Sequence, residues 1–296
     1  MKKILILGGG GMLGHKMYQV LRAGFDTAVT FRSFTPALAS TGLFDPSRVI
    51  QGVDVFSMAT VESAVERWKP DVVVNCVGVI KQLKEAHDPV QTIQINSLFP
   101  HLLARTCAGA GSRLIHISTD CVFSGSRGGY TESDVADAYD LYGRTKYLGE
   151  VTAPGMLTIR TSIIGHELFS RLSLVDWFLG NAGGTVRGYA KAIYTGLPTV
   201  VLAREAARII DTFPSLQGLY QVSSSPINKY DLLKLINEAY GSSITIEPYD
   251  GFVNDKSLDC SRYIAETGYR MVPWPEMITA MHTDYVQSNY QGMSHV

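Results

Sequence analysis

A tyrosine and a lysine four residues apart are the pair in this chain best suited to proton transfer. If residues 139–150 are helical, Tyr142 and Lys146 lie one turn apart on the same face. An ammonium group beside a phenol favours the phenolate and so lowers the pKa of the phenol. A phenol tuned in this way can exchange a proton with a substrate near neutral pH. Such pairs also occur on ordinary surface helices, so a catalytic role requires a nucleotide site and a further polar group elsewhere.

Three glycines near the N-terminus have the spacing of a nucleotide-binding turn. They lie between a short apolar run, residues 4–7, and a pattern of apolar residues at helical spacing over residues 12–21. Glycines permit a tight turn and a close approach of pyrophosphate to the backbone, and a helix N-terminus attracts the anion. A purely structural turn is the alternative interpretation. The expected dinucleotide contacts are Gly8, Gly11, Met12, Leu13 and Gly14.

The ends of the next two expected strands bear on the choice of cofactor. The strand at 26–31 is followed by Arg32, where an acidic residue is typical of NAD sites and an arginine suits a 2′-phosphate. Arg32 therefore predicts a preference for NADP(H), with NAD(H) as the other option, unless it is a solvated surface residue. The strand at 49–53 leads to Asp54 and Val55. The Asp54 carboxylate could accept a hydrogen bond from the adenine amino group or could cap a helix.

Alternating strands and helices in the first 160 residues determine the expected fold class. After the first three strands, we expect strands at 71–78, 113–117 and 156–160 and helices at 59–68, 90–110 and 139–150. This order predicts an α/β protein with a Rossmann-type, doubly wound parallel sheet. Ligands of such sheets bind at the carboxyl ends of the strands.

Two of these strand ends carry residues suited to ligand contact. The fourth strand ends in small residues that would let a cofactor approach the backbone, and the long helix after it carries an asparagine. The expected cofactor contacts there are Cys76, Val77, Gly78 and Asn96. The fifth strand ends at Ser118 and Thr119, whose hydroxyls could hydrogen-bond a substrate carbonyl or merely cap a turn.

After residue 160 the strand–helix alternation loosens, which predicts a smaller C-terminal lobe interleaved with the sheet domain. Helices are expected at 171–180, 198–213, 229–240 and from about 274, strands at 218–222 and 243–247, a hairpin or irregular segment at 184–194, and a polar, frayed tail at 287–296. We therefore assign 1–160 plus about 197–225 to a nucleotide-binding Rossmann domain. Residues from about 161 to 196 plus 226–296 would form an α/β substrate-binding lobe.

Composition excludes several classes of protein. The 296 residues are 46% hydrophobic and 18% charged, with a net charge of −1, which describes an ordinary globular protein without the basic surface that nucleic acids require. No apolar run has the length of a membrane span, and the glycines directly after residues 4–7 favour a strand over a signal peptide. The four cysteines and seven histidines have no metal-ligand spacing, so we expect no metal, reduced thiols and a cytoplasmic location.

Together these motifs resemble the extended short-chain dehydrogenase/reductase superfamily, and within it the dTDP-4-dehydrorhamnose reductase branch. Residues 117–125, Ile-Ser-Thr-Asp-Cys-Val-Phe-Ser-Gly, are similar to the Ser-Thr-Asp-Tyr-Val-Phe-x-Gly of that branch. Residues 142–150, 196–203 and 257–260 also fit its pattern, so the resemblance spans nearly the whole chain. Cys121 stands where the branch usually has tyrosine, and Asn-Cys-Val-Gly at 75–78 replaces its common Asn-x-Ala-Ala.

The resemblance implies NADPH-dependent reduction of the keto group of a nucleotide-linked 4-keto-6-deoxyhexose, in deoxysugar or cell-surface polysaccharide biosynthesis. Tyr142 would protonate the alkoxide, Lys146 would hold the nicotinamide ribose and lower the tyrosine pKa, and Thr119, assisted by Ser118, would orient the carbonyl oxygen. The implied substrate contacts are Val79, Lys81, Asp120, Val122 and Phe123.

Other functions of this superfamily stay open. One is an NADP-binding regulatory subunit without turnover, although such proteins typically lose the tyrosine or the lysine. Another is a sugar-nucleotide epimerase, which retains its cofactor. The related 4,6-dehydratases carry Asp-Glu after the threonine, and here Asp120 is followed by Cys121, which disfavours dehydration. A homodimer is open, and the sequence names neither the nucleotide nor the sugar.

Overall fold

The computed structural model describes residues 1–81, 88–288 and 290. By internal contacts the chain divides into two compact units. Unit 1 comprises Met1–Val122, Ala138–Arg160 and Ala203–Tyr220, and unit 2 comprises Phe123–Asp137, Thr161–Leu202 and Gln221–Val296. Both units are discontinuous in sequence. We expect one lobe to bind the cofactor and the other to bind the substrate. These roles and the expected boundaries stay predictions.

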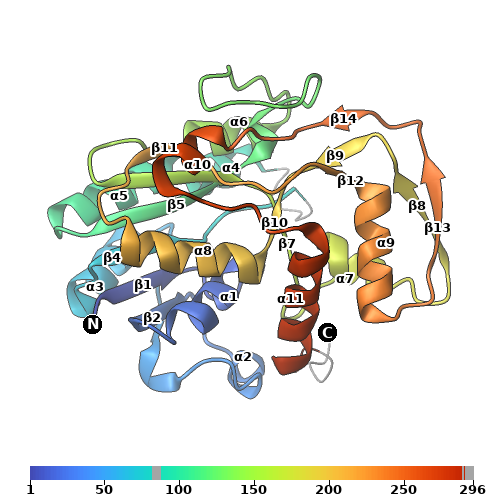
Figure 1. The fold of residues 1–296 in the computed structure, drawn as a ribbon. Helices are drawn as coiled ribbons and strands as arrows, with labels where there is room; N and C mark the ends of the chain where they lie inside the picture. Colours follow the sequence, from blue (N-terminus) through green and yellow to red (C-terminus); the bar gives the residue numbers. More distant parts are fainter. Residues whose placement is uncertain (82–87, 289, 291–296) are drawn as a thin grey trace. The chain divides into compact units, whose positions relative to one another are not determined.

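A seven-stranded sheet forms the centre of unit 1 (Figure 1), and its strand order confirms the doubly wound Rossmann-type topology. From one edge to the other the strands are β11 (Gly218–Gln221), β6 (Met156–Thr161), β5 (Arg113–Thr119), β4 (Val72–Asn75), β1 (Lys3–Leu7), β2 (Asp26–Phe31) and β3 (Val49–Gln51). The pairs joining β3 to β2, β2 to β1, β1 to β4 and β4 to β5 are parallel. The central strands are apolar runs because parallel strands of this type are covered on both faces.

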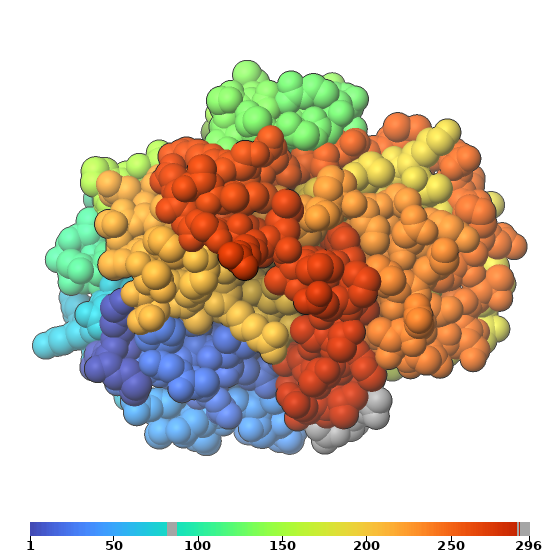
Figure 2. Space-filling model, viewed as in Figure 1, coloured from blue at the N-terminus to red at the C-terminus, as the bar shows by residue number. Residues whose placement is uncertain are grey.

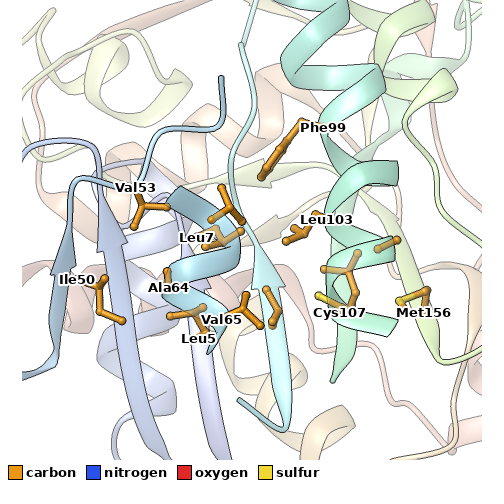
Figure 3. Close-up of a cluster of buried hydrophobic side chains, with 14 of the residues drawn as sticks. Leu5, Leu7, Ile50, Val53, Ala64, Val65, Phe99, Leu103, Cys107 and Met156 are labelled. Atoms are coloured by element: carbon orange, nitrogen blue, oxygen red, sulfur yellow. The ribbon is translucent and has the colours of Figure 1, made fainter. Parts of the chain in front are cut away.

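Two helices bury one face of this sheet, as Figure 3 shows. Side chains alternate along a strand, so Leu5 and Leu7 of β1 point to the same face. There they pack with Val65 of α3 (Met58–Trp68) and with Leu103 of α5 (Phe99–Gly109). This apolar packing holds the carboxyl ends of the strands in fixed positions.

The remaining helices of unit 1 are α1 (Met12–Leu21), α2 (Pro36–Ser40), α4 (Pro89–Ile93), α6 (Leu141–Leu148) and most of α8 (Thr199–Thr212), with short helical turns η1 (Pro46–Arg48) and η4 (Asp120–Val122). The helix expected at 90–110 is instead interrupted by a π-helical turn, η3 (Gln94–Leu98), between α4 and α5. Pro100 has no N–H to donate back into the helix, which accounts for the wider turn before it.

The fourth strand is shorter than expected. It ends at Asn75, because the Asn75 side-chain oxygen accepts a hydrogen bond from the Val77 N–H at 3.1 Å and turns the chain. Cys76, Val77 and Gly78 therefore lie in the segment after the strand.

Unit 2 contains three small sheets and four helices of its own in the described residues. The sheets pair β7 (Ile163–Ile164) with β10 (Leu197–Pro198), β9 (Ala192–Tyr194) with β12 (Ile227–Asn228) and β14 (Asn254–Asp255), and β8 (Thr185–Tyr189) with β13 (Thr245–Tyr249). The helices are α7 (Leu174–Leu179), α9 (Lys229–Tyr240), α10 (Ser261–Thr267) and α11 (Trp274–Gln287). In Figure 2 the yellow atoms of the segment around β9 lie close to the orange atoms of α9 on the visible face.

Of the two alternatives for residues 184–194, a hairpin or an irregular segment, the hairpin is wrong. β8 pairs in parallel with β13, and β9 pairs with β12 and β14, so the two strands do not pair with each other. The residues between them continue along a partner segment: the Ala190 N–H donates to Tyr249, and the Lys191 carbonyl accepts from Asn254. The frayed tail expected at 287–296 lies mostly outside the described residues. No helix in the described part of the chain is long and apolar enough to cross a membrane.

Candidate active site

Tyr142 and Lys146 lie on a helix whose start is fixed by a side chain. Asp140 is the N-cap of α6, and its Oδ1 accepts from the Gly143 N–H at 2.9 Å. Such a cap satisfies one of the free N–H groups of the first turn and fixes where the helix begins. The expected helix is thus confirmed, with Tyr142 in its first turn and Lys146 one turn later.

Two glycines that sequence reasoning did not single out let α6 approach its neighbours. A Cβ at Gly143 would overlap the carbonyl oxygen of Cys121, and one at Gly149 would overlap that of Asn96. Only glycine permits such close backbone contacts. A glycine inside a short helix is unfavourable unless close packing requires it. Gly143 could therefore have been identified from the sequence as a point of close contact.

Thr119 and Ser118 have different surroundings, although they are adjacent at the end of β5. The Thr119 hydroxyl lies near enough to the Tyr142 phenol to lower the pKa of that phenol, and it donates to Asp120 Oδ1 at 3.1 Å. Consecutive strand residues point to opposite faces. Accordingly, Ser118 donates to Glu150 Oε1 at 2.7 Å, and the Glu150 carboxylate also holds Arg160. The structure therefore brings Thr119, and not Ser118, to the phenol.

The direction of the Tyr142 pKa shift differs from the sequence-based expectation. Burial raises the pKa of the Tyr142 phenol, the nearby Cys121 and Asp120 raise it further, and the nearby Thr119 hydroxyl opposes them. The expected lowering of this pKa by Lys146 is wrong in this structure. Loss of hydration disfavours the phenolate more than the polar neighbours favour it.

Lys146 is buried and turned toward the strand. Its Nζ donates to the Ile117 carbonyl oxygen at 2.7 Å. Burial lowers the pKa of Lys146 to about 8, against the opposing effects of Glu150 and Cys76. A lysine whose pKa lies so near neutral pH is unusual in a merely structural position and is typical of functional sites.

The expected nucleotide loop contains glycines of two kinds. Gly8 has a φ of +87°, and a Cβ at Gly14 would overlap the Gly8 carbonyl, so the fold itself requires both. Gly9, which was not predicted, is also structural, because a Cβ there would meet the Val29 and Phe31 side chains. Gly11 is exposed at the N-terminus of α1, and a Cβ there would only touch the Gly8 carbonyl oxygen at 3.6 Å. The fold leaves the Gly11 backbone open, as an anion site at a helix N-terminus requires.

The other predicted cofactor residues lie around the same strand ends. Arg32 is exposed directly after β2. Asp54 does not cap α3, because the N-cap of that helix is Ser57. The Asp54 Oδ1 atom accepts from the Phe56 N–H at 3.0 Å. Val55 is partly buried against the apolar core.

Between β4 and η3, a side-chain clamp holds the chain. Asn96 Oδ1 accepts from the Val79 N–H at 2.9 Å, and its Nδ2 donates to the Val79 carbonyl at 3.0 Å. Lys146 Nζ lies 4.0 Å from where a Cβ of Gly78 would be. Burial raises the pKa of the Cys76 thiol to about 12, so it stays protonated at neutral pH. Asn96 thus fixes the segment that faces Lys146.

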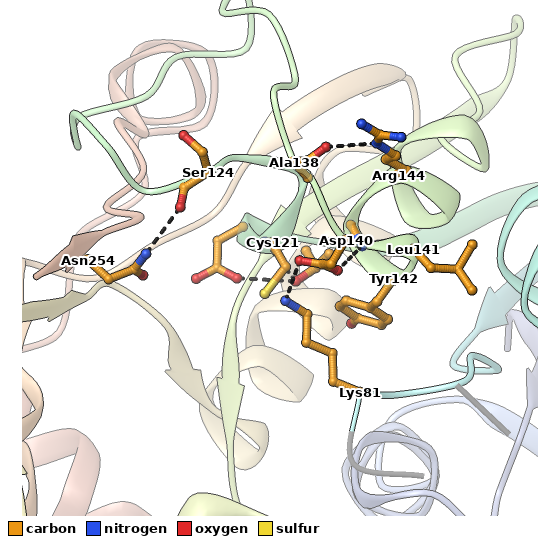
Figure 4. A network of polar contacts seen from close by, with 12 residues as sticks. Lys81, Cys121, Ser124, Ala138, Asp140, Leu141, Tyr142, Arg144 and Asn254 are labelled. Carbon is orange, nitrogen blue, oxygen red and sulfur yellow. Dashed lines mark hydrogen bonds and ion pairs between the residues drawn. The ribbon is translucent and has the colours of Figure 1, made fainter. Parts of the chain in front are cut away.

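The five residues predicted to contact substrate are not equivalent. Lys81 Nζ is 2.9 Å from Asp140 Oδ2 and stands over the Tyr142 ring, as Figure 4 shows. Val79 and Asp120 are buried, and they are hydrogen-bonded to Asn96 and Thr119, respectively. Val122 and Phe123 are fully buried, and Phe123 stacks on Tyr130 with ring centroids 4.1 Å apart. Of these five residues, only Lys81 has an exposed side chain. Across the described residues, no three histidine, cysteine or acidic side chains are grouped as metal ligands.

Comparison with known proteins places the chain in a family. The family model "RmlD substrate binding domain" matches residues 1–249, so the chain belongs to this family of extended short-chain dehydrogenase/reductase-like proteins. The sequence-based recognition is thereby confirmed.

Several curated relatives match over most of their length. The spore coat polysaccharide biosynthesis protein SpsK of Bacillus subtilis is 27% identical, with 94% of this chain and 96% of the relative covered. Methionine adenosyltransferase 2 subunit beta of Rattus norvegicus is 26% identical over 88% and 81% of the two chains. The dTDP-4-keto-6-deoxy-D-glucose reductase of Streptomyces niveus is 31% identical, but over only 49% of this chain and 45% of the relative.

Solved structures confirm the fold. The dTDP-4-dehydrorhamnose reductase of Bacillus anthracis, in complex with NADP, aligns with a TM-score of 0.76 at 21% identity, over 96% of this chain and 99% of that one. The UDP-glucose 4-epimerase of Thermus thermophilus, in complex with NAD, aligns with a TM-score of 0.77 at 20% identity, over 99% and 100%. Proteins with different chemistry therefore share this fold, and function has to be argued from the site.

Proposed function

We propose that the protein reduces the keto group of a nucleotide-linked 4-keto-6-deoxyhexose with NADPH, in deoxysugar or cell-surface polysaccharide biosynthesis. One observation carries this proposal: the Tyr142 phenol lies near the Thr119 hydroxyl at the end of β5, with Lys146 one turn further along α6. A protonated phenol at a strand end is suited to protonate a carbonyl oxygen as it is reduced. The reductase names among the relatives support the same class of substrate.

The residues of unit 1 fit a dinucleotide. The exposed Gly11 backbone at the N-terminus of α1 would hold the pyrophosphate, and Arg32 would meet a 2′-phosphate, which favours NADP(H) over NAD(H). Gly78 leaves room beside Lys146, which would hold the nicotinamide ribose. When bound, the reduced cofactor supplies the hydride. Unit 1 would be the cofactor-binding domain, and unit 2 would be the substrate-binding lobe.

The side chains of the site supply the proton and the orientation. Because the pKa of Tyr142 is raised, the phenol is protonated at neutral pH and can donate its proton to the carbonyl oxygen of the substrate. The Thr119 hydroxyl would hydrogen-bond the same oxygen. Ser118 would act indirectly, by holding Glu150 beside Lys146.

Substituting Gly11 tests the cofactor site. Gly11→Val should leave the melting temperature close to that of the wild type, because the backbone angles at Gly11 suit any residue and the Cβ has room. NADPH affinity, measured by titration calorimetry, should fall by about tenfold or more, since a side chain would block the close approach of the pyrophosphate. Gly24→Val is the matched control, as Gly24 is exposed with no atom near its Cβ position. Normal NADPH binding by folded Gly11→Val would contradict this location of the cofactor.

The deciding experiment for the activity is an NADPH-oxidation assay with a panel of nucleotide-linked 4-keto-6-deoxyhexoses. Stoichiometric oxidation of NADPH with loss of the ketosugar is the expected result. The similarity to a methionine adenosyltransferase subunit over most of its length favours a second candidate, a cofactor-binding subunit without turnover. That candidate predicts NADPH binding and no oxidation. An epimerase would convert a nucleotide sugar with no net oxidation of NADPH.

We also propose that the protein is a cytoplasmic homodimer. The described cysteines are free thiols, which fits a reducing compartment. Exposed apolar side chains gather on two segments of unit 1 that contact each other, α4–η3 and α6: Val90, Ile93, Leu98, Tyr147 and Leu148. Light scattering coupled to size-exclusion chromatography should give twice the chain mass, and Ile93→Asp with Leu148→Asp should give the monomer mass.

A further inference from the structure

A charge pair stands beside the Tyr142 ring and has no role in the mechanism above. Lys81 Nζ is 2.9 Å from Asp140 Oδ2 and 5.5 Å from the centroid of the Tyr142 ring. The other Asp140 oxygen caps α6 through the Gly143 N–H. Figure 4 shows Lys81 reaching from the segment after β4 to Asp140, next to the phenol. One carboxylate therefore fixes both the start of the helix and the position of an ammonium group over the aromatic ring.

The electrostatic surroundings of the phenol explain why this pair matters. The titratable groups that face Tyr142 come from three elements: Lys81 after β4, Asp120 and Cys121 in η4, and Asp140 at the start of α6. Lys146 lies on the same helix, but its ammonium is turned to the Ile117 carbonyl. Carboxylates near a phenol disfavour its ionisation, and a cation paired with a carboxylate reduces that effect. Lys81 is the cation that contacts both Asp140 and the Tyr142 ring.

We propose that Asp140 and Lys81 are positioning residues for the Tyr142 phenol. Asp140 fixes the first turn of α6 and holds the Lys81 ammonium over the ring, and Lys81 neutralises the Asp140 charge at the phenol. This role rests on the proposed function, because it concerns the acid strength of the proton donor. It differs from direct substrate contact by Lys81, since it acts with no substrate present.

The pH dependence of kcat tests the pair through two opposite substitutions. Lys81→Met leaves the Asp140 charge uncompensated, so the alkaline limb of the profile should move to higher pH, and the weaker acid should give a lower kcat. Asp140→Asn keeps the N-cap and removes the charge, so the limb should move to lower pH. Both side chains are partly exposed, so each shift should be about one pH unit or less. The double variant should lie between the two.

A second ion pair provides the matched control. On α9, Lys234 is 3.6 Å from Asp231, and its Nζ stands 5.2 Å from the centroid of the Tyr230 ring. Lys234→Met and Asp231→Asn should leave the pH profile unchanged. Asp140→Ser, a second variant that keeps a capping oxygen without the charge, should reproduce the shift of Asp140→Asn.

A readout without turnover separates this inference from the proposed activity. In protein labelled with ¹³C at the tyrosine Cζ, the Tyr142 resonance, assigned with Tyr142→Phe, reports ionisation of the phenol directly. Its high-pH onset should move up in Lys81→Met and down in Asp140→Asn. If the wild type reduces no ketosugar, the proposed activity fails and this titration still decides the inference. Opposite shifts with an unmoved control support the role of the pair, and any other pattern overturns it.

Discussion

Two partly buried tyrosines in this protein lie in polar clusters of opposite character. In unit 2, Tyr240 is hydrogen-bonded to His166 Nε2 at 2.7 Å, and His166 Nδ1 is 2.6 Å from Asp176. Asp176 also accepts from the Glu167 N–H at 2.7 Å and from Ser173. Burial raises the pKa of Tyr240, as it does that of Tyr142 in unit 1. The two phenols are thus alike in protonation and differ in their partners.

The difference lies in how well the charges are satisfied. Each ring nitrogen of His166 has a partner, and each carboxylate oxygen of Asp176 has at least one, so this cluster resembles a completed structural network. Near Tyr142, in contrast, burial lowers the pKa of Lys146 to about 8. The fold therefore keeps an ammonium group where loss of hydration disfavours its charge. Residues kept in this way are typical of sites selected for function at the expense of stability. Changes at the Tyr142 site should therefore affect activity, and changes in the His166 cluster should affect stability.

The largest expected effect comes from Tyr142→Phe. Removing one oxygen keeps the ring packed, so the melting temperature should change little. The ketosugar reduction rate should fall by about 10²–10⁴-fold, the usual contribution of a positioned general acid. NADPH affinity, measured separately, should stay near the wild-type value. Full reductase activity in this variant would remove the basis for the comparison and favour another catalytic acid.

The next effect concerns the cofactor and should not involve stability at all. Arg32 is exposed after β2, so Arg32→Asp should leave the free energy of unfolding almost unchanged. A charge-assisted contact with the 2′-phosphate contributes about 1.5–3 kcal/mol, so NADPH affinity should fall roughly ten- to a hundredfold. NADH affinity should not fall with it. Equal dissociation constants of the wild type for NADPH and NADH would contradict the predicted preference.

Lys146→Met should show the opposite signs for activity and stability. The variant should lose cofactor affinity and rate. Because the folded pKa of Lys146 is about 8, below its ordinary value near 10.5, the unfolded chain binds more protons between these two pH values. Below pH 8 the buried ammonium therefore lowers the free energy of unfolding of the wild type by its full amount. This cost disappears as pH rises toward about 10.5. Removing the buried charge relieves this penalty, and losing the hydrogen bond to Ile117 offsets part of the gain. The free energy of unfolding of the variant should therefore be about 1–3 kcal/mol higher than that of the wild type at pH 7.

Denaturant unfolding of the Lys146→Met variant at several pH values measures this difference. The gap between variant and wild type should close between pH 8 and about pH 10.5. Lys234→Met, at an exposed lysine of α9, is the control and should show no such pH dependence. A gap that stays constant with pH would mean that packing, and not the buried charge, produces it.

Local patterns were sufficient to predict most of the fold. The helix expected at 229–240 has the bounds Lys229–Tyr240, and the strand expected at 26–31 has the bounds Asp26–Phe31. Both segments have clear periodicity and a capping or turn residue at their ends. The strand expected at 243–247 corresponds to β13, but its parallel pairing with β8 was missed because the two strands lie far apart in sequence. Period and propensity carry no information on such partners.

Which side chains lie together at the candidate site was partly predictable from sequence, and their contacts were not. The grouping of Tyr142, Lys146 and Thr119 could be predicted because a capped helix and a strand end are both recognisable in sequence. The direction of the Lys146 ammonium was not predictable, since it depends on the Ile117 carbonyl and on burial. The role of Glu150 as the partner of Ser118 and Arg160 was likewise invisible, because it joins three segments through side chains alone.

The smallest effect is expected for the other tyrosine, and it completes the comparison. Tyr240→Phe removes the phenol oxygen that is bonded to His166 Nε2, and leaves a buried ring nitrogen without that partner. The loss of such a hydrogen bond should cost about 1–2 kcal/mol in the free energy of unfolding, while kcat and NADPH affinity stay at wild-type values. Urea unfolding and the reductase assay on the same preparation would show both. Tyr139→Phe, at a strongly exposed side chain outside the proposed dimer patch, is the matched control and should change neither quantity. If Tyr240→Phe lowered kcat as strongly as Tyr142→Phe, the His166 cluster would belong to the catalytic apparatus, and completeness of hydrogen bonding would not distinguish the two sites.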